Sequence, residues 1–219
     1  MFDLVLSPAY DLVAALTGLT GGLLAIVLFT VGVRLLLLPL GLRQARAQRI
    51  KVRLAPDVAE LRKRFARNPE RFQRELSSLY AREGTSLFAG FGSALAQLPF
   101  FLVMYRLFVS ATIAGQPNLL LAQSAIGVPL GDHFGAVLAH SGLFGAPALV
   151  FLGLFALLAL VAWQASRLTP ETPGMPMSKL FRLLPFGTVI AAGFLPLAAG
   201  IYLLVSTAWT TAERSLRTV

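Results

Sequence analysis

The chain has 219 residues, of which 56% are hydrophobic and 13% are charged, and its formal net charge is +9. This composition excludes an average soluble domain and indicates a polytopic membrane protein. The absence of cysteine excludes disulfides and thiolate metal sites. The two histidines, His133 and His140, stand in a glycine-rich loop without a carboxylate cluster, so we expect no metal and no cofactor.

The basic residues predict how the chain is oriented in a membrane. Twelve of the 19 Lys and Arg residues lie within residues 43–82, whereas residues 1–19 and 113–145 contain none. Because Lys and Arg collect on the cytoplasmic side, we expect the N-terminus outside and the C-terminus inside. Residues 1–18 mix apolar and acidic side chains and lack the basic start of a signal peptide, so we predict a short helix in the outer interface.

Residues 20–42 are an apolar run with a single charge, Arg34, and they are long enough to form the first helical span. At 1.5 Å per residue, Arg34 would lie roughly 13 Å inside the basic edge at Arg43. A charge at this depth is costly, so it must face other protein or water. Two interpretations stay open: Arg34 reaches out to the headgroups, or it is a working cation in a polar cavity. Thr30, one turn earlier on the same face, favours the cavity.

Residues 43–85 form a basic insert on the cytoplasmic side. Its apolar side chains follow two helical stripes, which are Ile50, Leu54, Val58, Leu61 and Phe65, then Phe72, Leu76 and Leu79. The Asn68-Pro69 turn signal lies between the stripes, so we predict a helical hairpin in which Pro56 either starts or kinks the first helix. The charge of the insert suits anionic headgroups or a ribosome surface. Without interleaved aromatic residues, we expect no specific nucleic-acid binding.

Two further spans follow the insert. Residues 87–112 run outward as the second span, with Gln97 inside it, and residues 146–166 run inward as the third, with Gln164 near its inner end. The glycine-rich outer loop lies between them.

The final apolar stretch, between Arg182 and Arg214, could form one long helix or two short spans. A single helix over it would be roughly 46 Å long, too long for one crossing, and it would place the last basic residues outside. Pro196 lies near the middle and permits a sharp turn. We therefore predict two short spans, 182–195 and 197–212, in a locally thinned bilayer. The whole chain, 1–219, is predicted to be one all-α domain with five transmembrane helices, the cytoplasmic hairpin and the outer interfacial helix.

Several motifs occur in a fixed order along the chain. They are Val33-Arg34 through Pro39-Leu40, the basic hairpin closing with Leu79-Tyr80 and Gly84, Gln97-Leu98-Pro99 with Tyr105, Gln164, and then Pro185, Leu195-Pro196 and Gly200. With these residues the chain resembles the YidC family of membrane protein insertases, within the Oxa/Alb superfamily, as a divergent bacterial paralogue. It departs from the family pattern at Thr85-Ser86, Ser93 and Leu204-Val205, where Asn-Pro, Pro and Tyr-Trp are usual.

The resemblance implies an insertase and chaperone of the bacterial plasma membrane rather than an enzyme. Such a protein moves hydrophilic tails of nascent membrane proteins across the bilayer through an inner-leaflet groove, where Arg34 would attract acidic residues. The implied groove lining is Thr30, Gln97, Gln164, Ser206 and Trp209. For the two glutamines and Ser206, hydrogen bonding between helices is an equally open interpretation, and Trp209 equally suits an interfacial belt. The ribosome, the targeting machinery and the Sec translocon are the implied partners of residues 43–85.

Three other classes are weighed against this expectation. A small-molecule or anion transporter, or a channel, would use Arg34 as its anion site, but such folds often show inverted repeats and none is visible here. A structural scaffold leaves the cost of Arg34 unexplained. An enzyme is disfavoured because no nucleophile–base set appears.

Overall fold

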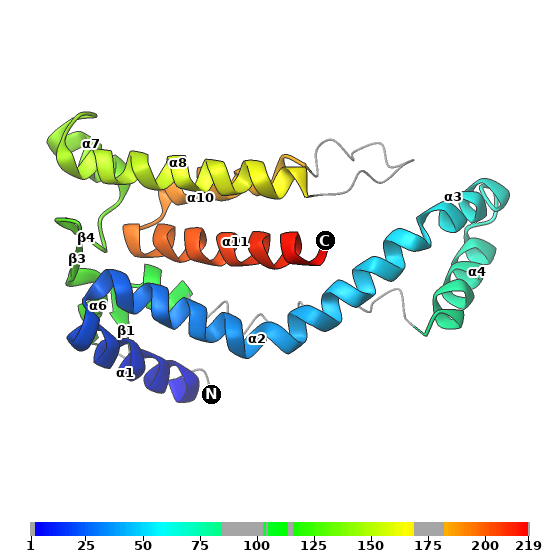
Figure 1. Ribbon diagram of the computed structural model, residues 1–219, viewed down its shortest axis with the longest axis horizontal. Coiled ribbons are helices and arrows are strands. Elements are labelled where there is room, and N and C mark those ends of the chain that lie inside the picture. Colours follow the sequence, from blue (N-terminus) through cyan, green and yellow to red (C-terminus); the bar gives the residue numbers. More distant parts are fainter. Residues whose placement is uncertain (1–2, 85–102, 104, 114–115, 169–181, 219) are drawn as a thin grey trace. The chain divides into compact units, whose positions relative to one another are not determined.

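The computed structural model describes residues 3–84, 103, 105–113, 116–168 and 182–218. Most of the predicted second span, 87–112, including Gln97, lies outside these residues. The chain divides into two compact units. Unit 1 comprises Met1–Leu35, Pro99–Thr169 and Leu180–Val219, and unit 2 comprises Leu36–Leu98 and Pro170–Lys179. The described part is largely helical, and within it the only strands are two antiparallel pairs of two residues each (Figure 1).

Unit 1 begins with helix α1 (Asp3–Thr20), which packs against α6 (Leu119–Ala122). Helix α6 belongs to the segment 112–145, which is called the outer loop below after its predicted location. Gly21 alone separates α1 from α2 (Gly22–Arg53) and has a φ of +79°. Because glycine has no Cβ, it adopts this left-handed conformation without a steric penalty, which allows an abrupt change of direction between the two helices.

Helix α2 continues past the apolar run into the basic segment, ending only at Arg53. Alanine, arginine, glutamine and lysine dominate the stretch after Leu42, and these residues favour a helix. The helix is interrupted at Leu54, and the next helix, α3 (Ala55–Arg64), has Pro56 in its first turn. Pro56 therefore starts a helix rather than kinking one, and the stripe from Ile50 to Phe65 is split over two helices instead of one.

The outer loop of unit 1 is built from short elements. They are β1 (Thr112–Ile113) paired with β2 (Gln116–Pro117), then α6, then β3 (Ser124–Ala125) paired with β4 (Val128–Pro129), and α7 (Phe134–Ser141). The buried Asn118 holds the first part together. Its side-chain amide donates to the carbonyls of Leu107 (2.8 Å) and Ser110 (3.1 Å), and its side-chain oxygen accepts from the Leu120 N–H (3.2 Å).

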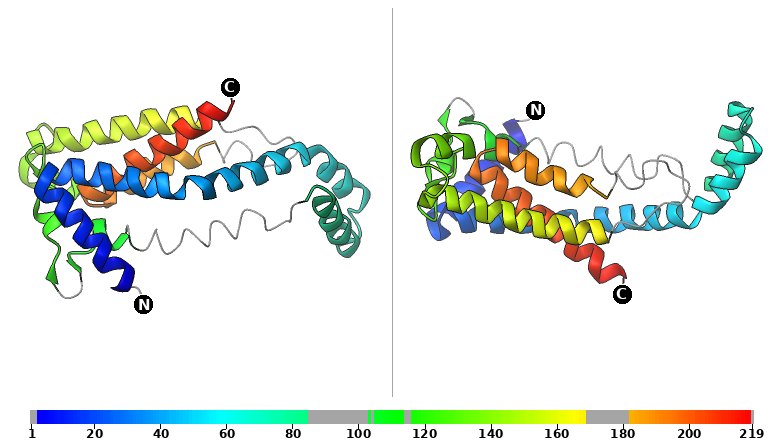
Figure 2. Two further views of the ribbon diagram at one scale, coloured as in Figure 1. Left: turned by 60° about the horizontal axis from the view of Figure 1, so that its bottom comes forward. Right: turned by 90° about the horizontal axis from the view of Figure 1, so that it is seen from above.

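Helix α8 (Ala146–Arg167) follows the loop and coincides with the predicted third span but for one residue. Beyond it lie a 3-10 turn η1 (Leu184–Phe186), α10 (Gly187–Phe194) and α11 (Leu197–Thr218). The break between α10 and α11 falls at Leu195-Pro196, where the sequence places a turn. Helices α8, α10 and α11 lie side by side in both views of Figure 2.

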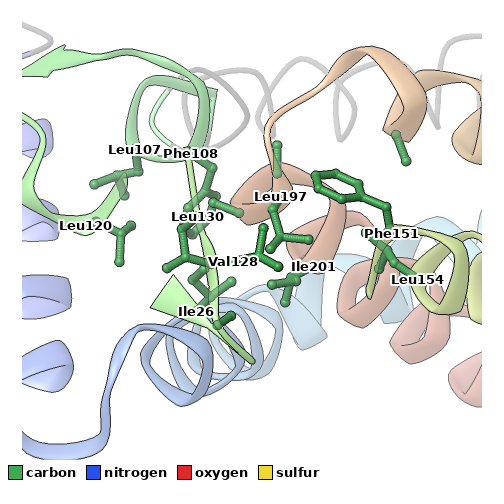
Figure 3. Close-up of a cluster of buried hydrophobic side chains, with 14 of the residues drawn as sticks. Ile26, Leu107, Phe108, Leu120, Val128, Leu130, Phe151, Leu154, Leu197 and Ile201 are labelled. Carbon is green, nitrogen blue, oxygen red and sulfur yellow. The ribbon is translucent and has the colours of Figure 1, made fainter. Parts of the chain in front are cut away.

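The core of unit 1 joins the outer loop to these helices. Figure 3 shows Ile26 of α2, Leu130 after β4, Phe151 of α8 and Leu197 of α11 among its buried side chains. The backbone N–H groups of Leu197 and Ala198 donate to the carbonyls of Asp132 and Leu130, each at 2.9 Å. The start of α11 is therefore hydrogen-bonded to the outer loop, which satisfies two donors that a helix start leaves without a partner.

Two helices of the described residues are long and apolar enough to cross a membrane: Gly22–Leu42, with mean hydropathy 2.5, and Ala146–Arg167, with mean hydropathy 2.4. Only 22% and 28% of their most apolar windows are buried within the chain. A core helix of a soluble protein would be largely covered by its own chain. These low fractions therefore fit helices whose apolar surface faces lipid.

Unit 2 contains α3 and α4 (Pro69–Arg82), which contact each other. Asn68 caps α4, because its side chain accepts a hydrogen bond from the Arg71 N–H at 3.1 Å. An ion pair between Arg53, at the end of α2, and Glu83, just after α4, brings the two ends of this segment together.

Candidate functional site

Arg34 lies on α2 within the apolar window and is partly exposed. Its guanidinium donates a hydrogen bond to the hydroxyl of Ser206 on α11, 172 residues later in the chain. Ser206 is 5% exposed. The structure therefore brings two of the predicted site residues together, and the contact ties the first long helix of unit 1 to the last.

Ser206 belongs to a polar stripe on α11. The hydroxyl of Thr210 donates to the carbonyl of Ser206 (2.9 Å), that of Thr207 to the carbonyl of Leu203 (2.6 Å), and that of Thr211 to the carbonyl of Thr207 (2.8 Å). Each hydroxyl proton is used within the helix, so the hydroxyl oxygens keep their acceptor capacity. Sequence reasoning named only Ser206 here, although the run of four hydroxyl residues within 206–211 was a visible signal.

The other predicted site residues are placed differently. Thr30 is 1% exposed, and its hydroxyl donates to the Ile26 carbonyl at 2.6 Å, so its polar group is satisfied within α2. Trp209 lies on α11 three residues after Ser206 and is half-buried. Gln164 is exposed near the end of α8, and within the described part of the chain no hydrogen bond joins it to Arg34. Gln97 lies outside the described residues.

The charge of Arg34 is not neutralised within the described ranges, where no carboxylate forms an ion pair with it. Its hydrogen-bond partner is a neutral hydroxyl. A hydroxyl orients the guanidinium but leaves its full positive charge in place. Because Arg34 is only partly exposed and its helix is apolar, its attraction for an anion is less screened than that of a charge in bulk water.

The end of α8 carries a contact between a guanidinium and an aromatic ring. The guanidinium carbon of Arg167 lies 4.2 Å from the ring centroid of Trp163, which is half-exposed. Such pairs are attractive through the ring quadrupole. A tryptophan beside an arginine at the end of an apolar helix is typical of the boundary between hydrocarbon and water, and it indicates where the span of α8 ends.

The sequence profile of the family described as 60Kd inner membrane protein matches residues 15–217 of this chain. A membrane protein insertase YidC of Clostridium perfringens is 32% identical over 115 residues, which cover 51% of this chain and 48% of that protein. A membrane protein insertase YidC of Acidiphilium cryptum is 26% identical over 190 residues, covering 84% of this chain and 31% of the relative. A third YidC insertase, from Mycolicibacterium paratuberculosis, is 26% identical over 249 aligned residues, which cover 94% of this chain and 70% of that protein. The chain thus spans less than half the length of the first two relatives.

Proposed function

Because the chain belongs to the family of the 60Kd inner membrane protein, we propose that it acts as a membrane protein insertase. Similar proteins from several bacteria bear this name. The proposed task is to move hydrophilic tails of nascent membrane proteins across the bilayer while the apolar segments that follow enter lipid. No covalent bond changes in this task, so the protein contributes shape, charge and water access.

The contact between Arg34 and Ser206 is the observation that carries the proposal. Arg34 is a cation in an apolar helix, it is partly exposed, and its partner is neutral. A charge in a membrane-spanning segment costs several kcal/mol by most measures, a cost that a purely structural helix has no reason to bear. A cation held by a hydroxyl is instead available to an acidic residue of a passing tail.

In the proposed mechanism the groove around Arg34 opens to the cytoplasm and to lipid in the inner leaflet. Its lining is Arg34, Thr30, Gln97, Gln164, Ser206 and Trp209. Because Thr30 is buried and its hydroxyl already bonds within α2, it would pack behind the surface of the groove rather than offer a free hydroxyl. The half-buried Thr207 and Thr210 of α11 would add acceptors for backbone N–H groups of an extended tail. Water in the groove shortens the dry path that a polar tail must cross.

The proposed membrane arrangement has five spans, with an outer interfacial helix at residues 1–18 and a cytoplasmic helical hairpin at residues 43–85. The N-terminus is outside and the C-terminus is inside the bacterial plasma membrane, as the distribution of basic residues favours. The packed pair of α3 and α4 supports the hairpin part of this arrangement. The basic hairpin is the proposed contact for ribosomes, the targeting machinery or the Sec translocon.

Insertion assays with two substrates test the role of Arg34. Two single-span proteins that differ only in an acidic or a neutral translocated tail are supplied to proteoliposomes, and protection of the tail from protease is measured. We expect Arg34→Ala to lower insertion of the acidic tail about tenfold and to leave the neutral tail nearly unchanged, since the lost attraction acts only on charge.

Arg34→Lys and Arg106→Ala are the matched controls for this assay. Lysine keeps the charge, so it should retain much of the insertion that alanine loses. Arg106 is a second arginine in an apolar stretch, but its side chain is exposed at the outer end, so its removal should have little effect. Equal insertion of both tails by the Arg34→Ala protein would contradict the proposed role.

A further inference from the structure

Two turns in the outer loop of unit 1 expose large apolar side chains. Ile126, at the tip of the β3–β4 hairpin, is 75% exposed, and Phe144, between α7 and α8, is 86% exposed. Leu143, beside Phe144, is also exposed. Apolar side chains at the tips of turns contribute little to a core, and an environment that removes them from water would stabilise this end of the chain.

The backbone at Ile126 strengthens this point. Ala125 pairs with Val128, so Ile126 and Gly127 form a two-residue turn, with φ values of +53° and +77°. A turn with two positive φ values favours Asn-Gly, and a β-branched residue in the left-handed region is a steric outlier. The tip therefore holds a residue that suits neither its backbone conformation nor water.

Both turns lie where the apolar helices of unit 1 begin. Phe144 comes two residues before the start of α8 at Ala146. The β3–β4 hairpin leads directly into Leu130, whose carbonyl accepts from the first turn of α11. The side chain of Leu130 also packs on Gly22 at the start of α2, where an added Cβ would lie 2.6 Å from it. Figure 1 shows these elements at one end of unit 1.

The charge of this region points to one kind of partner. Between residues 113 and 145 Asp132 is the single formal charge, and there is no Lys or Arg. Such a surface has no cation for a phosphate group or an acidic protein. An apolar tip at the level where apolar spans begin matches the boundary between headgroups and acyl chains.

We propose that Ile126 and Phe144 are lipid anchors that insert into the outer leaflet and set the depth of unit 1 in the bilayer. This inference rests on the membrane arrangement of the proposed function, but it does not depend on insertase activity. The occupant of both tips is lipid, and cover by a second protein or a second copy of this chain is a competing outcome.

Because the chain has no cysteine, single cysteines labelled with an environment-sensitive fluorophore test the proposal in the whole 219-residue chain. The vesicles consist of zwitterionic phosphatidylcholine and phosphatidylethanolamine, which carry no net charge to attract the basic α4. Ile126→Cys and Phe144→Cys carry the probe at the tips. Leu157→Cys, exposed in the middle of α8, is the control within lipid, and Ser77→Cys, exposed on α4, is the control in water. Lipids with a nitroxide near the glycerol backbone or deep in the acyl chain serve as quenchers, and iodide reports water.

We expect the shallow nitroxide to quench both tip probes at least about twofold more than the deep nitroxide does. At residue 157 the deep nitroxide should quench more than the shallow one, and at residue 77 neither nitroxide should quench. Iodide quenching of the tips equal to that at residue 77 would overturn the proposal. Protection from iodide without quenching by either lipid would also overturn it, because the tips would then be covered by protein. These readings stay valid even if the protein inserts no substrate.

Ile126→Asn separates anchoring from folding. Asparagine tolerates the left-handed conformation, so the thermal midpoint in detergent should stay the same or rise. A probe at Ser124→Cys should nevertheless lose about half of its shallow-lipid quenching in this background, while Ile126→Leu, which keeps an apolar side chain, should retain it. Unchanged quenching with Ile126→Asn would show that the tip does not hold the hairpin in lipid.

Discussion

The guanidinium of Arg34 donates to the hydroxyl of Ser206, joining the first and last long helices of unit 1. The acceptor is a neutral group on the one element of the unit that carries four hydroxyl side chains within six residues, 206–211. This pairing orients the cation without cancelling its charge. A carboxylate in the same place would satisfy the guanidinium more fully and would also remove the attraction for an incoming anion.

Substitutions at Ser206 test whether insertion depends on the orientation of the Arg34 guanidinium or on its free charge. Ser206→Asn keeps a neutral acceptor, and insertion of an acidic-tail substrate should stay within about twofold of the unmodified protein. Ser206→Asp places a carboxylate on Arg34, and the resulting ion pair competes with the substrate, so insertion of that substrate should fall about tenfold. Protease protection of the tail measures both. Equal insertion by the two variants would mean that the free charge of Arg34 is not used.

Removing α3 and α4 tests the basic segment separately from the apolar helices. The ion pair of Arg53 and Glu83 brings the two ends of this segment close together, so a Gly-Ser linker of about four residues can replace residues 54–82 without strain. We expect normal membrane integration and loss of substrate or ribosome association, followed by crosslinking and cosedimentation. Replacing Arg64, Arg67, Arg71 and Arg74 with glutamine should reproduce the loss if charge is responsible. Unchanged substrate crosslinking would reduce the basic segment to a topology signal.

Asn118 is expected to stabilise the outer loop. Asn118→Ala removes a buried amide and leaves the carbonyls of Leu107 and Ser110 without their partner, which should cost about 1–3 kcal/mol. The thermal midpoint in detergent should fall by roughly 2–12 °C for a chain of this size. Asn118→Asp keeps the cap on the Leu120 N–H but loses the donors, so it should be no more stable than alanine. Gln123→Ala, at an exposed position in the same loop, is the control and should change little.

The contact between α8 and α11 depends on a glycine. A Cβ at Gly200 would lie 2.6 Å from Cδ2 of the buried Leu154, so Gly200→Val should lower stability by about 1–3 kcal/mol through overpacking. Combining it with Leu154→Ala should recover part of this loss, because the cavity admits the added methyl groups. Gly193→Ala in α10 meets no atom within 4 Å and is the matched control. Strictly additive effects of the two substitutions would show that these positions are not packed as described.

Local features of the fold were visible in the sequence because they depend on neighbouring residues. Hydropathy over about twenty residues predicted the helix at 146–166, which the structure extends by one residue at Arg167. The backbone restriction of Pro196 predicted the break between the last two helices, and it lies at Leu195-Pro196. The end of α2 was harder to place, because no residue between Leu42 and Arg53 disfavours a helix and only Pro56 stops it.

What the sequence alone determined is therefore the two long apolar helices at Gly22–Leu42 and Ala146–Arg167, the helical basic segment after Leu42 and the presence of an unusual cation at Arg34. The tertiary structure decided that this cation meets Ser206, that Thr30 turns its hydroxyl back to its own helix, and that Asn118 organises the outer loop. The physical reason is the sequence separation over which each property is decided. Helix formation and apolarity follow from residues a few positions apart, whereas the partner of a side chain 172 residues away depends on how whole helices pack.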